Sequence, residues 1–341
     1  MKKLFATVLL FSCVSAMRAQ DIHFSQFNEN PLHLNPANTG LFDGLFRVNL
    51  NYRSQWAVMG HPYTTMAAAF DMPLMYAKNR SYLGVGAFLY RDVAGDSKFG
   101  TVQGLVSVSG IVPLNDYNKL SVGIQGGYSQ RSATISGLQW ESQYVNGAYD
   151  PTALSNENNT LASFPFMDFS AGAAYQYRSV AGNLVGKDVF EFVAGAAAFH
   201  LNKPTMEFHA GGSDRMDMRY VVHAQVRYDV PDTRWSIRPS GYYMAQGPAK
   251  EVLIGGLVRY RIKNGTKVTN FFSESGIGLG AHYRMKDAII PQLYYDLGDF
   301  FIGLSYDLNI SKYSQVSKMN GGYEITIRYA NLNGALYKNR K

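Results

Sequence analysis

The stretch RYVVHAQVRY, residues Arg219 to Tyr228, alternates between two kinds of side chain. Every second position is apolar or aromatic: Tyr220, Val222, Ala224, Val226 and Tyr228. Most of the positions between them are polar: Arg219, His223, Gln225 and Arg227. A lipid-facing row beside a water-facing row, with an aromatic residue at each end, is typical of a transmembrane β-strand.

The same alternation recurs along the chain, for example over residues 169–178, 276–284 and 323–329. About fourteen such segments can be recognised, each about 9–12 residues long, which is the length that a tilted strand needs to cross a bilayer. They begin near Leu45, Tyr63, Tyr82, Phe99, Leu120, Asp168, Phe190, Arg219, Trp235, Val252, Gly276, Ala288, Phe300 and Gly322. The sequence therefore predicts an all-β outer-membrane barrel of about 14 antiparallel strands. A soluble β-sandwich or propeller is the alternative, but strands in water do not need aromatic residues at both ends.

Composition favours the barrel. Charged residues make up 17% of the chain, against about 25% in ordinary soluble domains, and there are 24 tyrosines. The net charge is +7, of which the first nineteen residues contribute +3 through Lys2, Lys3 and Arg18, leaving +4. Because Lys338, Arg340 and Lys341 lie together at the end of the chain, no basic stripe remains that would indicate nucleic-acid binding.

The start of the chain has the pattern of a signal peptide. A basic beginning is followed by a short apolar run, Leu4 to Val14, and by small residues up to Ala19. Cleavage is expected after Ala19, with Ala16 as a second site, and Cys13 leaves a lipoprotein reading open. We expect four regions: a signal peptide (1–19), an N-terminal periplasmic plug or clamp (20–43), the barrel (44–331) and a basic tail (332–341).

Loop lengths predict the orientation of the barrel. If the first strand runs outward, the longest connections, 130–167 and 202–217, both lie outside the cell, and short turns such as 231–233 lie in the periplasm. Outer-membrane barrels keep their long loops outside and their short turns inside. An even number of strands also predicts that both chain ends are periplasmic.

No catalytic or cofactor-binding motif is recognisable. The one cysteine, Cys13, lies in the expected signal, so the mature chain has no thiol for a disulfide, a metal site or a nucleophile. The seven histidines show no metal-ligand spacing, and the run Gly276-x-Gly278-x-Gly280 lies in an alternating strand without the helix that a dinucleotide site needs. We expect no enzyme activity, no cofactor, no metal and no nucleic-acid partner.

The residues behind the signal resemble a known family. DIHFSQFNENPLHLNPANTG (21–40) and YRSQW (52–56) closely resemble the start of PorP/SprF proteins, outer-membrane components of the type IX secretion and gliding machinery. The resemblance is carried by His23, Phe24, Ser25, Gln26, Phe27, Pro31, Leu34, Asn35, Pro36, Ala37, Gly40, Arg53, Gln55 and Trp56. The segment Asn28-Glu29-Asn30 departs from the family pattern, which leaves the local contacts of this segment open.

The resemblance implies a non-enzymatic docking protein. Its partners would be outer-membrane lipids, secreted proteins or adhesins with a C-terminal sorting domain, and translocon or periplasmic ring and peptidoglycan-linked components. We expect residues 20–43 to order the periplasmic mouth of the barrel, with Phe24 and Phe27 as two anchors; an unstructured leader is the alternative.

A passive diffusion channel is the second functional reading. It would use lumen-facing Arg178, Arg227, Arg259 and Arg284 to favour anions. Many inward positions are instead glycine, alanine or aromatic, which predicts a filled interior.

Overall fold

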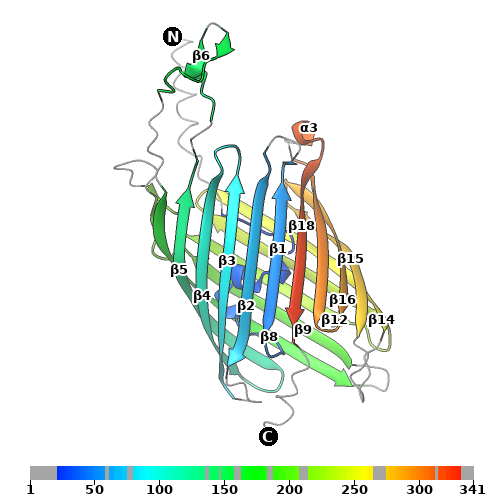
Figure 1. Ribbon diagram of the computed structural model, residues 1–341. Helices are drawn as coiled ribbons and strands as arrows, with labels where there is room; N and C mark the ends of the chain where they lie inside the picture. Colours follow the sequence, from blue (N-terminus) through cyan, green and yellow to red (C-terminus); the bar gives the residue numbers. More distant parts are fainter. Residues whose placement is uncertain are drawn as a thin grey trace, which may run out of the picture.

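A computed structural model describes residues 21–57, 61–74, 80–134, 138–145, 147–156, 163–182, 187–206, 214–263, 274–311 and 314–331. Fourteen strands within these residues form one closed antiparallel barrel, as the sequence predicts (Figure 1). They are β1 (Arg47–Gln55), β2 (Tyr63–Leu74), β3 (Tyr82–Ala94), β4 (Phe99–Pro113), β5 (Asn118–Ser132), β8 (Phe164–Gly182), β9 (Lys187–Phe199), β12 (Arg219–Asp229), β13 (Trp235–Gln246), β14 (Ala249–Lys263), β15 (Ser275–Arg284), β16 (Ala288–Leu297), β17 (Phe300–Asn309) and β18 (Asn320–Ala330). The first and last strands pair from Arg47 with Ala330 to Gln55 with Gly322, so the sheet has no free edge. The expected signal peptide and basic tail lie outside the described residues.

The barrel is apolar outside and polar inside. On β4, Val106 is 64% exposed, whereas the hydroxyl of the adjacent Ser107 is buried in the lumen. Residues 219–228 on β12 show the same pattern: Tyr220, Val222 and Tyr228 face outward, while Arg219 and His223 are buried inside. An outer wall of exposed aliphatic side chains is stable in lipid and would be unfavourable in water.

Aromatic side chains pair between neighbouring strands near both ends of the barrel. At one end Phe300 packs on Tyr329 and Phe190 on Tyr228. At the other end Tyr52 packs on Tyr323. Such belts mark the two interfaces between lipid and water.

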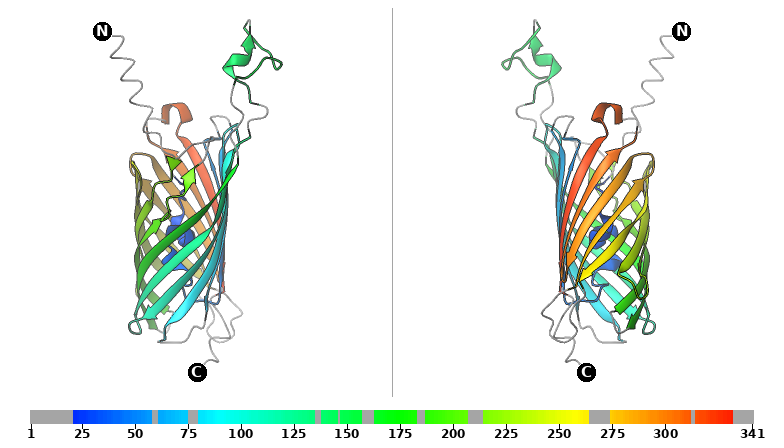
Figure 2. Two further views of the ribbon diagram at one scale, coloured as in Figure 1. Left: turned by 90° about the vertical axis from the view of Figure 1, so that its left-hand side faces the viewer. Right: turned by 90° about the vertical axis from the view of Figure 1, so that its right-hand side faces the viewer.

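The two ends differ in their connections. One end carries the long connections 133–163 and 200–218; we call it the outer end, because barrels of this type keep long loops outside the cell. The other, the inner end, carries short turns such as 114–117, 230–234 and 298–299. Two small sheets lie in the long connections: β6 (Tyr144–Val145) with β7 (Ala148–Tyr149), and β10 (Thr205–Met206) with β11 (Asp214–Arg215) (Figure 2). Among the described residues, no helix has the length and apolar character needed to cross a membrane.

The N-terminal segment runs through the whole lumen, which corrects two expectations. Its short helical turns lie inside the barrel (Figures 1 and 2), so it is not confined to the periplasmic mouth. Gly40 and Leu45 contact the inner end, through Asp71 and Asn331, as expected. Asp21, however, lies at the outer end, where its backbone N–H donates to Gln246. The expectation that the N-terminal end is periplasmic is therefore wrong for Asp21, because a segment preceding β1 can turn back through the lumen.

Single cysteines test the orientation of the barrel. Asn156→Cys in the long connection should react with an impermeant thiol reagent on whole cells, and Asp232→Cys in a short turn should react only after permeabilisation. The one native cysteine, Cys13, lies in the expected signal peptide, away from both reporter positions. The reverse labelling pattern would show that the barrel is inverted.

Candidate functional site

The most strongly organised part of the lumen is the contact between the N-terminal segment and the barrel wall. We call residues Asp21 to Leu41 the lumen segment. It contains three short helical turns among the described residues: η2 (Phe27–Glu29), α2 (Pro31–Leu34) and η3 (Pro36–Asn38). Each of the last two begins with a proline that follows an asparagine. Asn35 is extended, as a residue before proline should be, and its side chain accepts a hydrogen bond from Ala37 N at 2.9 Å.

Phe24 and Phe27 are both buried and pack against different parts of the wall. Phe24 lies with Leu32 and Phe88 in one apolar cluster. The Phe27 ring meets Tyr242 edge-on, with 4.9 Å between ring centroids, in another cluster. Edge-to-face pairs of this kind are favourable beyond the area that they bury. The two rings therefore attach the segment at two independent places.

Between the two rings lies a buried network of charges, which we call the central cluster: Ser25, Arg53, Arg284, Asp307 and Glu324. Glu324 accepts hydrogen bonds from the backbone N–H groups of Ser25 at 2.7 Å and Gln26 at 3.1 Å. Asp307 accepts from the Ser25 hydroxyl at 2.7 Å and pairs with Arg53 at 2.8 Å and Arg284 at 2.9 Å. Arg53 also donates to the carbonyl of His23. The side chains of Glu324, Asp307 and Arg53 thus give the backbone and hydroxyl groups of the segment hydrogen-bond partners that no regular sheet or helix supplies there.

Towards the inner end the segment lies on wall positions without side chains. A Cβ atom at Gly84 would come within 2.1 Å of Thr39 O, one at Gly123 within 2.4 Å of Pro36 O, and one at Gly172 within 2.1 Å of Asn35 Oδ1. We call these three residues the glycine surface. Only glycine allows the segment to approach three strands so closely, with its backbone at Gly84 and Gly123 and with the Asn35 side chain at Gly172.

Hydroxyl groups beside the glycine surface satisfy the carbonyls of the segment. Ser121 donates to Ala37 O at 2.6 Å and Ser109 to Thr39 O at 2.5 Å. The Gly40 N–H donates to Asp71 at 2.8 Å.

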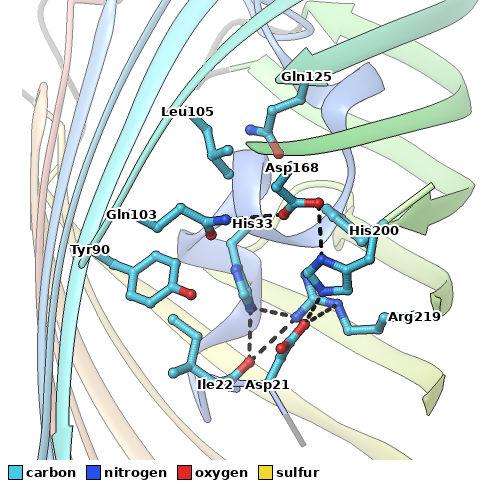
Figure 3. Close-up of a pocket in the computed structure, with 11 residues that line it drawn as sticks. Asp21, Ile22, His33, Tyr90, Gln103, Leu105, Gln125, Asp168, His200 and Arg219 are labelled. Carbon is cyan, nitrogen blue, oxygen red and sulfur yellow. Dashed lines mark hydrogen bonds and ion pairs between the residues drawn. The ribbon is translucent and has the colours of Figure 1, made fainter. Parts of the chain in front are cut away.

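A second charged group lies at the outer end (Figure 3), and we call it the outer cluster: Asp21, His33, Asp168, His200 and Arg219. The His200 ring lies between two carboxylates, at 3.0 Å from Asp168 and in direct contact with Asp21. Arg219 lies 3.6 Å from the Asp21 carboxylate and stacks on Phe199 at 4.1 Å. A cavity of about 10 Å³, room for about one water molecule, adjoins the cluster.

Asp21 and His200 in the outer cluster stabilise each other's charged forms. Burial alone would raise the pKa of Asp21, but His200 and Arg219 outweigh it and hold that pKa well below its usual range. Burial would favour neutral His200, yet Asp21 and Asp168 raise its pKa to about 9. His33, buried beside Arg219, has its pKa lowered to about 3 and stays neutral.

Stability at the outer end should therefore depend on pH. Because the folded pKa of His200 is raised from 6.5 to about 9, its contribution is complete below about pH 6.5 and is lost as pH rises through about 9. Hydrogen exchange of residues 21–24, corrected for its intrinsic rate, should accelerate over that range in the parent. His200→Gln should show no such step; an identical step in both would mean that His200 does not hold the segment.

Substitution of the glycine surface should displace the segment. In Gly123→Val the added side chain meets backbone atoms that cannot turn away, and overpacking of this kind costs about 1–3 kcal/mol. A reporter cysteine at the buried Ala37 should then react with a thiol reagent about tenfold faster. Gly110→Val is the matched control, because a Cβ atom there meets nothing within 4 Å. Equal labelling in both variants would contradict the close approach.

The structure brings most of the residues of the resemblance together. His23 through Phe27, Pro31 through Ala37 and Gly40 all lie in the lumen, and Arg53 reaches them from β1. Gln55 and Trp56 lie instead at the outer rim, where the Trp56 ring packs on Tyr63 with 5.0 Å between centroids. The open question about Asn28 and Glu29 is answered by wall contacts: Asn28 donates to Ser240 at 2.8 Å, and Glu29 pairs with Arg328 at 2.5 Å.

The wall partners Asp71, Asp307 and the glycine surface were not among the residues singled out from the sequence. In the sequence these residues can be recognised only as small or acidic residues at the inward-facing positions of alternating strands. Among the described residues, no group of three or more His, Cys, Asp or Glu side chains is placed to hold a metal ion.

A closed barrel with a lipid-facing apolar wall, and with its own N-terminal segment in the lumen, defines an integral outer-membrane barrel protein. The chain belongs to the PorP/SprF family, the type IX secretion system membrane proteins, whose family profile matches residues 16–329. Family and fold fit a membrane component of a secretion system rather than an enzyme, and they place the protein in the outer membrane. No curated protein matches the sequence.

Solved barrels share the fold at low identity. The CymD monoaromatic hydrocarbon channel is 12% identical, with 92% of this chain and 94% of that chain covered and a TM-score of 0.45. The P. putida toluene transporter TodX is 9% identical, covering 87% and 92%, with a TM-score of 0.43. BamA from Haemophilus ducreyi lacking POTRA domains 1-3 is 10% identical, covering 84% and 70%, with a TM-score of 0.42.

Proposed function

We propose that this protein is a docking barrel of the type IX secretion system. It holds a secreted protein or adhesin with a C-terminal sorting domain at the outer end, and it meets translocon or periplasmic ring components at the inner end. The observation that carries the proposal is the lumen segment, which fills the barrel and turns it into a solid scaffold. Membership of the PorP/SprF family supplies the secretion context.

The filled lumen weighs against a diffusion channel. Two cavities lined by described residues beside the lumen segment measure about 10 and 20 Å³, which is room for about one water molecule each. Arg178, Arg259 and Arg284, which would have favoured anions, are paired with Asp43, Asp296 and Asp307. In planar bilayers the protein should conduct little; steady conductance of the parent would favour the channel.

The described part of connection 133–163 is the best candidate surface for the secreted partner. Tyr144, Val145 and Leu154 are exposed there, and Leu154 reaches 80%. Residues 138–156 include the acids Glu141 and Asp150 and no lysine, arginine or histidine. Exposed aromatic and aliphatic side chains with a single sign of charge are suited to a complementary basic, partly apolar partner surface.

Replacement of residues 138–156 by a Gly-Ser linker of equal length tests the proposal. Secreted proteins should move from the cell surface into the medium, as measured by quantitative mass spectrometry of both fractions, while the amount of barrel stays unchanged. A control replaces the short turn 230–234 at the inner end, which should leave already secreted proteins on the surface. Retention of every surface protein in the 138–156 variant would show that this connection is not the docking surface. Retention in a strain lacking the whole protein would contradict docking itself.

A further inference from the structure

The carboxylate of Asp21 occupies a site that the barrel wall builds without it (Figure 3). Asp168 on β8 orients His200 at 3.0 Å, and Phe199 supports the Arg219 guanidinium at 4.1 Å. The resulting pair of cationic groups grips Asp21, while Gln246 accepts its backbone N–H at 3.0 Å. A buried pocket with a histidine, an arginine and an adjacent amide has the chemistry of a carboxylate receptor.

The first residues of the lumen segment can leave this site without moving the rest. The segment is fixed from His23 onward: Arg53 donates to the His23 carbonyl, the Phe24 ring is buried with Leu32 and Phe88, and Glu324 accepts from the Ser25 N–H. Only Asp21 and Ile22 precede that fixed part within the described residues, and they belong to no helix or strand. The site also lies at the outer end, next to the connections 200–218 and 247–248.

An empty site would be strongly unfavourable. If Asp21 left the site and no other group replaced it, Arg219 and the charged His200 would remain buried and would share one nearby carboxylate, Asp168. Uncompensated buried charge destabilises a protein far more than an exchanged partner does. The departure of Asp21 is therefore favourable only when another carboxylate takes its place.

The geometry points to a carboxylate-exchange site at the outer end, which Asp21 occupies at rest and from which a carboxylate of an extended secreted polypeptide displaces it. This inference rests on the proposed docking function and adds the chemistry by which the partner is recognised. Displacement would free Asp21 and Ile22 at the outer end, while the Phe24 ring and the central cluster hold the rest of the segment in the lumen. The incoming group would use the volume that Asp21 vacates.

Chemical rescue of Asp21→Ala tests the receptor without any partner. The purified full-length variant should melt at a lower temperature than the parent, and sodium acetate should raise that temperature by several degrees more than sodium chloride of equal ionic strength. The parent, whose site is occupied, should respond alike to both salts. Asp21→Ala/His200→Gln should lose the specific response to acetate. Equal effects of acetate and chloride on a folded Asp21→Ala, or equal effects of acetate and phosphate, would overturn the assignment to carboxylates.

Displacement is tested on the parent with a pair of short peptides that differ only in a free or an amidated C-terminal carboxylate. The free form should accelerate hydrogen exchange at residues 21 and 22, and the amidated form should not. Equal exchange with both peptides would overturn the exchange step. Neither measurement depends on surface display. The carboxylate-exchange site can therefore be disproved while the docking function stands, and docking can be disproved while the site still binds carboxylates.

Discussion

Replacing Phe24 and Phe27 together by alanine should detach the lumen segment from a barrel that still assembles. Each ring is buried, and truncation of a buried phenylalanine costs about 3–5 kcal/mol. Because the two rings lie in separate clusters, the costs should add to about 6–10 kcal/mol. The fourteen-strand ladder does not use either side chain, so the inter-strand hydrogen bonds remain intact.

Five measurements follow the double variant. Its amount in the outer membrane and its altered gel mobility without boiling should match the parent, while the lumen segment should become accessible to protease and conductance should appear in planar bilayers. Surface display of the secreted partner should fall if a filled lumen is needed for docking. Val106→Ala is the control, because it removes an exposed apolar side chain of the lipid-facing wall, outside both the lumen and the long connections. A double variant that stays closed to protease and ions would show that the polar contacts alone hold the segment.

Strand positions were predictable because the signal is local. Tyr63, Tyr82, Phe99, Trp235 and Phe300 each begin a strand at the expected residue. Alternation with a period of two is a property of a few neighbouring residues, and the choice between lipid and lumen is repeated at each of them. The outward positions of β12 were therefore correct without knowledge of any partner strand.

The path of the lumen segment was not predictable from such a signal. Ser25 meets Glu324 across 299 positions of sequence, and this contact depends on a lumen whose width is set by all the strands together. A proline favours an extended residue before it, as at Asn35, but a local preference does not say whether the segment runs towards the inner or the outer end. The mouth was expected because it is the nearest place to the start of β1.

The inward glycines illustrate the same limit. Small residues at inward positions indicated a filled interior, and the lumen segment lies against three of them. The sequence did not indicate that Gly84 and Gly123 would meet the backbone of Thr39 and Pro36, or that Gly172 would meet the side chain of Asn35, since the three glycines come from different strands. Arg53 was singled out by resemblance, whereas its partner Asp307 lies 254 positions away.

Asp307→Asn should be the most damaging change within the central cluster, because one carboxylate serves two arginines. Arg284 would keep Asp287 at 3.1 Å and Glu251 at 3.4 Å, but Arg53 would lose its 2.8 Å partner while 2% exposed. Breaking a buried ion pair from one side costs about 3–5 kcal/mol. The melting temperature should fall, and hydrogen exchange at residues 23–27 should accelerate.

Adding Arg53→Met to Asp307→Asn shows whether Asp307 stabilises the segment by pairing with the Arg53 charge or by accepting the hydrogen bond from Ser25. If the loss comes from an unpaired charge, the double variant should recover a large part of the melting temperature, because a methionine in place of the arginine removes the charge that lacked a partner. Asp96→Asn serves as the control: its pair with His61 is largely exposed, so its loss should change stability by less than about 1 kcal/mol. If the double variant is as unstable as the single one, Asp307 acts through its hydrogen bond from Ser25 rather than through charge. The recovery would mean that the charges of the central cluster fix where the segment lies, while the rings of Phe24 and Phe27 supply most of the energy that keeps it there.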